Sequence, residues 1–138
     1  GWPALGTQLQ ENKMSNPRPF TEFTLEKVHD EGAVNASIRW VITEKDGSEN
    51  YALRVIELAA HGNTPHHTHW FEHQNYVIEG EGTVTIGDDT FAVKAGDVIF
   101  VPGDVQHQYR NTGDGPLKFL CGIPQPWIKE ARAELGED

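Results

Sequence analysis

Histidine is the residue type in this chain whose number and spacing point to a chemical role. Three of the seven histidines fall within one short segment and a fourth follows later; they are His67, His69, His73 and His107. In an extended strand, residues two or four positions apart project from the same face, so the first three could point together. Neutral imidazole is a preferred ligand of Zn, Cu, Fe and Ni. The pattern predicts one metal ion held by four imidazoles, because a metal would satisfy four inward-facing polar rings at once.

The length and composition fit a single globular domain. With 138 residues, the chain is long enough to bury a core. It has no run of eighteen apolar residues and no basic start followed by an apolar stretch, so we expect neither a membrane span nor a secretory signal. The 21 acidic residues against 11 basic ones give a net charge of -10, which disfavours nucleic acid and anionic membranes as partners. The single cysteine, Cys121, excludes an internal disulfide and fits a reducing compartment, so we expect a cytoplasmic protein.

Turn residues divide the chain into short segments. Residues 1–19 show no periodicity and predict an irregular N-terminal arm. Over residues 20–125, β-branched and aromatic runs alternate with turns about every eight to twelve residues, which indicates about nine strands in an all-β sandwich or barrel. Good helix formers follow Pro126 and stop at Gly136, so residues 126–138 predict a short helical tail. The runs expected as strands are 36–42, 51–59, 75–79, 83–86, 90–93, 98–101, 107–110 and 117–122.

Two blocks of residues resemble the paired motifs of the cupin superfamily, whose members are small β-barrels that hold a metal inside. The first motif places a His-x-His pair and a carboxylate between two glycines, and it is similar to residues 62–80. The second combines glycine, proline, histidine and asparagine, and residues 96–111 keep its spacing. The resemblance covers about residues 50–122 and implies an all-β cupin double-stranded β-helix, a jelly-roll barrel, of the small single-domain kind. The matching positions are Gly62, His67, His69, His73 and Gly80, then Gly96, Pro102, His107 and Asn111.

The chain departs from the family pattern at three places. Gly62 lies one residue closer to the histidine pair than is usual. Asp104 replaces the second motif's glycine, although Gly103 beside it can make the turn. His73 stands at the carboxylate position, which resembles the four-histidine single-domain cupins that bind Mn(II) or another divalent ion. Gln74 is the alternative fourth ligand, but strand alternation would turn it away from the face of His73.

A set of four neutral imidazoles determines the chemistry that we expect. It leaves a divalent ion its full +2 charge, which makes the ion a stronger Lewis acid and attracts anionic substrates such as carboxylates or enolates. Four ligands around a six-coordinate ion leave two positions open, for a chelating substrate or for substrate and O₂ together. The resemblance favours Mn(II) or Fe(II), one per chain, and imidazole also allows Zn, Ni or Cu.

Several residues near the motifs are candidates for contact with the substrate. Tyr109 lies two residues beyond His107, shares its face and could donate a proton, which makes it the candidate catalytic residue. An inward-facing arginine could clamp a carboxylate, and a tryptophan could form a wall of the pocket. For each of these candidate residues, the alternative to substrate contact is a structural role in the core or on a face of the barrel. The candidates for substrate binding are Arg54, Asn75, Trp40 and Arg39.

We expect a metal-dependent enzyme that acts on a small organic acid or enol. Within that class an oxygenase is favoured, because all-nitrogen ligation occurs among O₂-using cupins. A non-redox isomerase, lyase or cyclase remains open, since it needs the same ligands. A sensor or storage cupin that binds a small ligand without turnover is a further alternative. The resemblance also implies a homodimer, in which the alternating residues 20–30 could add a strand to the partner's sheet.

Overall fold

The computed structural model describes residues 17–135, and most of the regular structure in this part of the chain is β-strand. One short helix, α2 (Ile128–Glu134), follows the last strand, as the sequence predicts. No helix among these residues is long and apolar enough to cross a membrane. The strands are β1 (Glu26–Lys27), β2 (Val34–Ile42), β3 (Tyr51–Asn63), β4 (His73–Glu79), β5 (Glu81–Ile86), β6 (Asp89–Lys94), β7 (Val98–Val101), β8 (His107–Asn111) and β9 (Leu117–Pro124).

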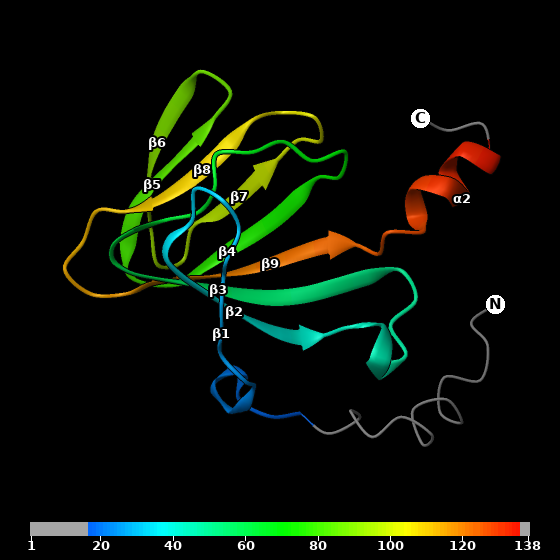
Figure 1. Cartoon of the computed structure of the whole chain (residues 1–138), viewed down its shortest axis with the longest axis horizontal. Coiled ribbons are helices and arrows are strands. Elements are labelled where there is room, and N and C mark those ends of the chain that lie inside the picture. The colour runs from blue at the N-terminus through cyan, green and yellow to red at the C-terminus, as the bar shows by residue number, and fades with distance from the viewer. Residues whose placement is uncertain (1–16, 136–138) are drawn as a thin grey trace.

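The strands curl into a barrel with two walls (Figure 1). Hydrogen-bonded neighbours follow the order β6-β5-β8-β3-β9-β4-β7, and β2 joins this path through β3. In Figure 1, β5, β6 and β8 lie together at the upper left, and β2, β3 and β9 cross below them. All strand pairs are antiparallel. This arrangement confirms the all-β barrel that the sequence predicts.

Alternation along the strands builds the interior of the barrel. In β4, His73, Asn75 and Val77 are buried, whereas Gln74 and Tyr76 are exposed. Successive side chains of a strand point to opposite faces, so every second residue enters the interior. The polar residues therefore enter at one end of β4 and the apolar Val77 enters further along. The apolar core consists of Ala36, Ile56, Leu58, Val77, Val84, Val93, Ile99, Val101, Tyr109, Leu117 and Phe119.

The N-terminal part of the described chain differs from the expectation. Residues 20–30 do not form one alternating strand; they contain a 3-10 turn at Phe20–Glu22 and the two-residue strand β1. β1 pairs with β2 of the same chain, with Glu26 opposite Ile38. This pairing uses one edge of β1, and the other edge has no strand partner within the described residues. Of the expected arm over residues 1–19, the first sixteen residues lie outside the described part.

Asp104, and not the glycine beside it, makes the left-handed turn before β8. Its φ is 62°, and its N–H donates to the His69 carbonyl oxygen at 2.7 Å. Gly103 is needed for another reason, since a Cβ there would lie 2.5 Å from the Trp70 carbonyl oxygen. These two close backbone approaches hold the loop that carries His69 against the turn before β8. The left-handed position therefore stays where the motif has its glycine, and the expectation that Gly103 would make this turn was wrong.

Candidate metal centre

Three of the four predicted ligand histidines converge. One ring nitrogen each of His67, His69 and His107 lies within 4.8 Å of the others. Two backbone hydrogen bonds of 3.2 and 3.1 Å join His67 to His107 at the start of β8. His69 lies in an irregular loop after β3 and not in a strand. Pairing of this loop with β8, rather than strand alternation, brings the three rings together.

The spacing of the ring nitrogens fits a shared metal ion. The Nε2 atoms of His67 and His69 are 3.2 Å apart. Two nitrogens that bind one metal at about 2.0–2.1 Å in adjacent positions lie roughly 3.0–3.4 Å apart. A neutral imidazole has a lone pair on only one nitrogen, and lone pairs that face each other are unfavourable without a cation. These histidines, with His107, could therefore hold a metal.

His73 lies next to this group but outside its tightest part. Its ring centroid is 4.8 Å from that of His107 and 5.4 Å from that of His69. The side chain is buried, and among the described residues its Nε2 atom has no hydrogen-bond partner. A buried polar atom without a partner is costly, so this nitrogen needs a ligand. Gln74 is exposed and lines a larger hollow outside the barrel instead, as strand alternation predicts.

A backbone carbonyl determines the orientation of the His107 ring. Its Nδ1 lies 2.9 Å from the Val105 carbonyl oxygen. Because a carbonyl only accepts, Nδ1 carries the proton and Nε2 keeps its lone pair. Metal-binding histidines usually have such a partner on the second nitrogen. The His107 ring is therefore prepared to offer Nε2 to a cation.

All four histidines are held in the neutral form that a metal requires. Burial, followed by the charge of His67, lowers the pKa of His69 to about 4. Burial, followed by the charge of Arg54, lowers the pKa of His73 to about 3. Burial is also the main cause of the lowered pKa values of His67 and His107. The lone pairs of the four rings are thus available at neutral pH.

A cavity of about 370 Å³ adjoins three of the histidines, His67, His73 and His107. One transverse row of paired residues lines it, with Trp40 on β2, Arg54 on β3, Cys121 on β9 and Asn75 on β4. Each residue is the register partner of the next, so their side chains share the inner face of the wall. Tyr109 lines the cavity from β8. Strand pairing therefore brings four of the five candidate substrate contacts into one cavity.

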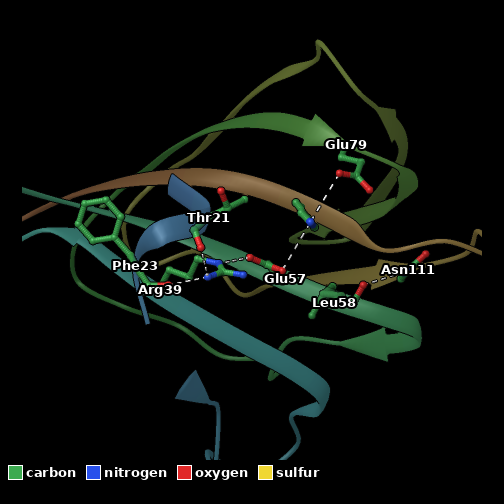
Figure 2. Close-up of polar contacts among 8 residues, drawn as sticks. Thr21, Phe23, Arg39, Glu57, Leu58, Glu79 and Asn111 are labelled. Atoms are coloured by element: carbon green, nitrogen blue, oxygen red, sulfur yellow. Dashed lines mark hydrogen bonds and ion pairs between the residues drawn. The ribbon is translucent and has the colours of Figure 1, made fainter. Parts of the chain in front are cut away.

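Arg39 is the predicted candidate that does not belong to the cavity. It alternates with Trp40 along β2 and so points to the other face of the sheet. Its guanidinium pairs with the Glu57 carboxylate and donates to the carbonyl oxygens of Thr21 and Phe23, as Figure 2 shows. These contacts fasten the N-terminal segment to the outer face. The expectation that Arg39 clamps a substrate carboxylate was wrong, because strand parity turns it outward.

Tyr109 and Asn75 are joined inside the cavity. The Asn75 side-chain amide donates to the Tyr109 hydroxyl oxygen at 2.7 Å. Both residues are buried, and the Tyr109 ring stacks on Phe119 with centroids 4.1 Å apart. Burial raises the pKa of the Tyr109 phenol far above its usual value of 10.0. Tyr109 is therefore a neutral hydrogen-bond donor rather than a base.

Arg54 brings a positive charge into the cavity wall. Its guanidinium carbon lies 5.7 Å from the centroid of the Trp40 ring, within the range of a cation–π contact. Its Nε atom is buried and has no partner in the described part of the chain. No ion pair joins Arg54 to an acidic side chain within residues 17–135. A half-buried arginine without a counter-charge favours an anionic ligand.

Cys121 is the residue in the wall whose contacts sequence reasoning missed. Its sulfur lies 3.2 Å from His73 Nδ1 and 3.6 Å from a guanidinium nitrogen of Arg54. In the sequence it is only the central residue of an apolar run. Its inward parity on the last strand was a usable signal. The register that places it opposite both Arg54 and Asn75 was not visible without the fold.

The comparison with known protein families supports the cupin resemblance that these residues indicate. The family model Cupin_2, described as a cupin domain, matches residues 54–123, just over half of the 138 residues. The match includes all four candidate ligand histidines. The chain belongs to the cupin family.

Individual relatives include enzymes. The polyketide cyclase RemF from Streptomyces resistomycificus is 30% identical, with a TM-score of 0.74 over 79% of this chain and 78% of that one. An uncharacterized protein of Methanocaldococcus jannaschii is 40% identical over 55 residues, which are 40% of this chain and 44% of that protein. A gentisate 1,2-dioxygenase from Streptomyces sp is 32% identical over 78 residues, which are 54% of this chain and 22% of the dioxygenase. The chain thus spans less than half the length of these two curated relatives.

Proposed function

We propose that this chain is a divalent-metal-dependent enzyme that acts on a small anionic organic molecule. The observation that carries the proposal is a cluster of neutral histidines beside a cavity whose wall contains the guanidinium of Arg54, which has no ion-pair partner within residues 17–135. When bound, a divalent metal supplies Lewis-acid polarisation of a substrate oxygen and, for Mn(II) or Fe(II), redox chemistry with O₂. The residues around it bind, orient and shield the substrate.

His67, His69, His107 and His73 are the proposed ligands. The first three have converging ring nitrogens, and the buried, unpartnered Nε2 of His73 supports it as the fourth. Four neutral ligands would leave the ion its full charge, which favours an anionic substrate. The proposed metal is Mn(II) or Fe(II), one per chain, with Zn, Ni or Cu compatible with the same nitrogens.

The cavity wall supports a small carboxylate or enolate as the substrate. Arg54 would bind the anionic group, and Trp40 beside it would cover an apolar or aromatic portion. Tyr109 accepts a hydrogen bond from Asn75, so its own proton is free to be donated into the cavity. Its raised pKa supports a donor role, to a substrate oxygen or carbon that gains negative charge.

An oxygenase is the first form of this proposal. The similarity to gentisate 1,2-dioxygenase supports it, since that relative uses O₂ on a small aromatic acid. A non-redox cyclase, isomerase or lyase is the second form, supported by the similarity to the polyketide cyclase RemF and by the donor role of Tyr109. Turnover without O₂ separates the two, because an oxygenase stops and a cyclase or isomerase continues.

Elemental analysis of the purified protein tests the proposal. About one Mn or Fe per chain is expected in the wild type, and none in the variant with His67→Ala and His107→Ala. A variant with His61→Ala and His66→Ala, at exposed positions outside the site, is the matched control and should keep the metal. Zn or Ni in the wild type would shift the weight to the non-redox form. A protein that takes up no divalent ion would contradict the enzyme proposal and leave a cupin that binds or stores a small ligand.

The net charge and the family support a proposal on the compartment, the oligomeric state and the partners of the protein. We propose a cytoplasmic homodimer that binds neither nucleic acid nor membranes, consistent with a net charge of -10. β1, within residues 20–30, pairs with β2 on one edge, and its other edge could add to the partner's sheet. Light scattering on the eluting peak of a gel-filtration column would give the mass, and a monomer of 15.4 kDa would contradict this part of the proposal.

A further inference from the structure

We propose that Cys121 is a positioning residue of the metal site: its sulfur accepts the Nδ1–H of His73 and so leaves the Nε2 lone pair free for a metal. The inference rests on the proposed function, in which His73 is the fourth ligand. It gives a role to the single cysteine of the chain.

The contacts of Cys121 place it at the back of the His73 ring. Its sulfur is 3.2 Å from Nδ1. Cys121 is 1% exposed and His73 is 4% exposed, so protein atoms and not bulk water surround this contact. β9 and β4 are paired around it, with Cys121 opposite Asn75, two residues beyond His73. The backbone register thus holds the thiol and the ring together.

The hydrogen-bond partners of Nδ1 and Nε2 indicate which of its two neutral forms the His73 ring adopts. A neutral imidazole carries one N–H, on Nδ1 or on Nε2. On Nε2 it would be a buried donor without an acceptor, because that atom of His73 has no partner within residues 17–135. On Nδ1 it reaches the sulfur of Cys121. His107 has the corresponding arrangement, in which Nδ1 donates to the Val105 carbonyl oxygen at 2.9 Å.

Arg54 offers the competing arrangement. A guanidinium only donates, so a hydrogen bond from Arg54 to His73 Nδ1 would put the ring proton on Nε2. The separation of 3.4 Å is longer than the range of about 2.7–3.2 Å usual for N–H donors. Sulfur is a larger atom than nitrogen or oxygen, so 3.2 Å to Cys121 is a close approach. The geometry therefore favours the sulfur as the partner of Nδ1.

The ring proton can be located directly in metal-free protein. Two-bond ¹H–¹⁵N correlation spectra at pH 7.5 distinguish the two forms, and the His73→Ala spectrum assigns the signals. We expect the Nδ1–H form in the wild type and in Cys121→Ser, which keeps an acceptor, and its loss in Cys121→Val, which fills the space without one. A wild-type His73 with its proton on Nε2 would overturn the inference.

Metal affinity provides the second readout. Loss of the partner of a ligand histidine weakens metal binding by roughly 10–100-fold, so Mn(II) titration of Cys121→Val should show at least a tenfold weaker Kd. Cys121→Ser should stay close to the wild type. Val77→Ala, a fully buried change on β4, is the control for a general loss of packing and should bind normally.

The outcomes separate this inference from the proposed function. Normal metal binding by Cys121→Val, or equal weakening by Val77→Ala, would overturn the role of Cys121 and leave the metal site intact. A wild-type protein that binds no divalent ion would overturn both.

Discussion

The side-chain amide of Asn75 on β4 donates to the hydroxyl oxygen of Tyr109 on β8, and this bond of 2.7 Å joins the two walls of the barrel at the cavity. Asn75 is 4% exposed and Tyr109 is 2% exposed, so water does not compete for either group. Because the hydroxyl oxygen accepts, the phenol proton is left to point elsewhere. One hydrogen bond thus both ties the walls together and orients the donor that the proposed chemistry uses.

Replacing Tyr109 by Phe tests this bond. The change leaves the Asn75 amide buried without its acceptor, so the free energy of unfolding should fall by about 1–3 kcal/mol. Urea unfolding of metal-free Tyr109→Phe measures the loss. In an Asn75→Ala background the same change should cost clearly less, because the amide is already absent. Equal costs in both backgrounds would mean that the two side chains are not coupled.

Substitutions at two neighbouring residues distinguish the candidates for the fourth metal ligand. His73→Ala should weaken Mn(II) binding by at least roughly tenfold, since even partners of ligand histidines contribute 10–100-fold. Gln74→Ala should leave the affinity unchanged, because Gln74 is exposed on the opposite face of β4. Isothermal titration of the metal-free proteins gives both constants. The reverse result would move the ligand to Gln74.

The anion-binding role of Arg54 can be tested against an arginine of the outer face. Arg54→Met should weaken the binding of benzoate to the metal-loaded protein by roughly tenfold or more, which corresponds to the loss of a hydrogen bond to a charged group. Arg39→Met should leave benzoate binding unchanged and lower the stability, because Arg39 pairs with Glu57 outside the cavity. If both variants bind benzoate equally well, Arg54 is not the anion site.

The neutral histidines make the metal-free protein sensitive to acid. The folded-state pKa values of His69 and His73 are lowered from 6.5 to about 4 and about 3. Between these values and 6.5 the unfolded chain binds protons that the folded chain does not, so stability is present above pH 6.5 and is lost as the pH falls through this window. Urea midpoints at pH 7.5 and 5.0 should show the decrease. The variant with His69→Gln and His73→Gln is the control and should depend less on pH; an equal slope would contradict the assignment.

Gly80, the last glycine of the first motif, should tolerate no side chain. Its φ is +87°, and a Cβ would lie 2.1 Å from the Pro116 carbonyl oxygen. Gly80→Ala should lower the free energy of unfolding by more than about 1 kcal/mol, because both strain and a backbone clash oppose it. Gly115→Ala, where a Cβ would have nothing within 4 Å, is the matched control. Thermal unfolding of the two variants gives the comparison.

The fold could be read from the sequence because its signals are local. Short alternating runs and turn residues predicted nearly every strand, and parity along β4 separated His73 from Gln74. The exception at residues 20–30 has a physical reason. The contacts that shape the segment come from Arg39, which is distant in the sequence.

The cavity wall was less predictable because it depends on pairing between strands. The row that joins Arg54, Cys121 and Asn75 exists only through the registers of β3, β9 and β4. Single-strand parity could name Arg54 and Asn75 as candidates but could not bring Cys121 to His73. The convergence of His67 with His107 likewise depends on a loop that pairs with β8.

The alternation of β4 has a consequence for how this site can change. β4 is hydrogen-bonded on both edges, to β7 and to β9, so it cannot slide independently of them. A slip of β4 by one residue relative to β7 and β9 would exchange the two faces of the strand, send His73 and Asn75 to the solvent and bring Gln74 and Tyr76 inside. Substitutions on β4 can therefore change the lining of this pocket one side chain at a time, whereas a one-residue shift in the register of the strand would remove the pocket residues together.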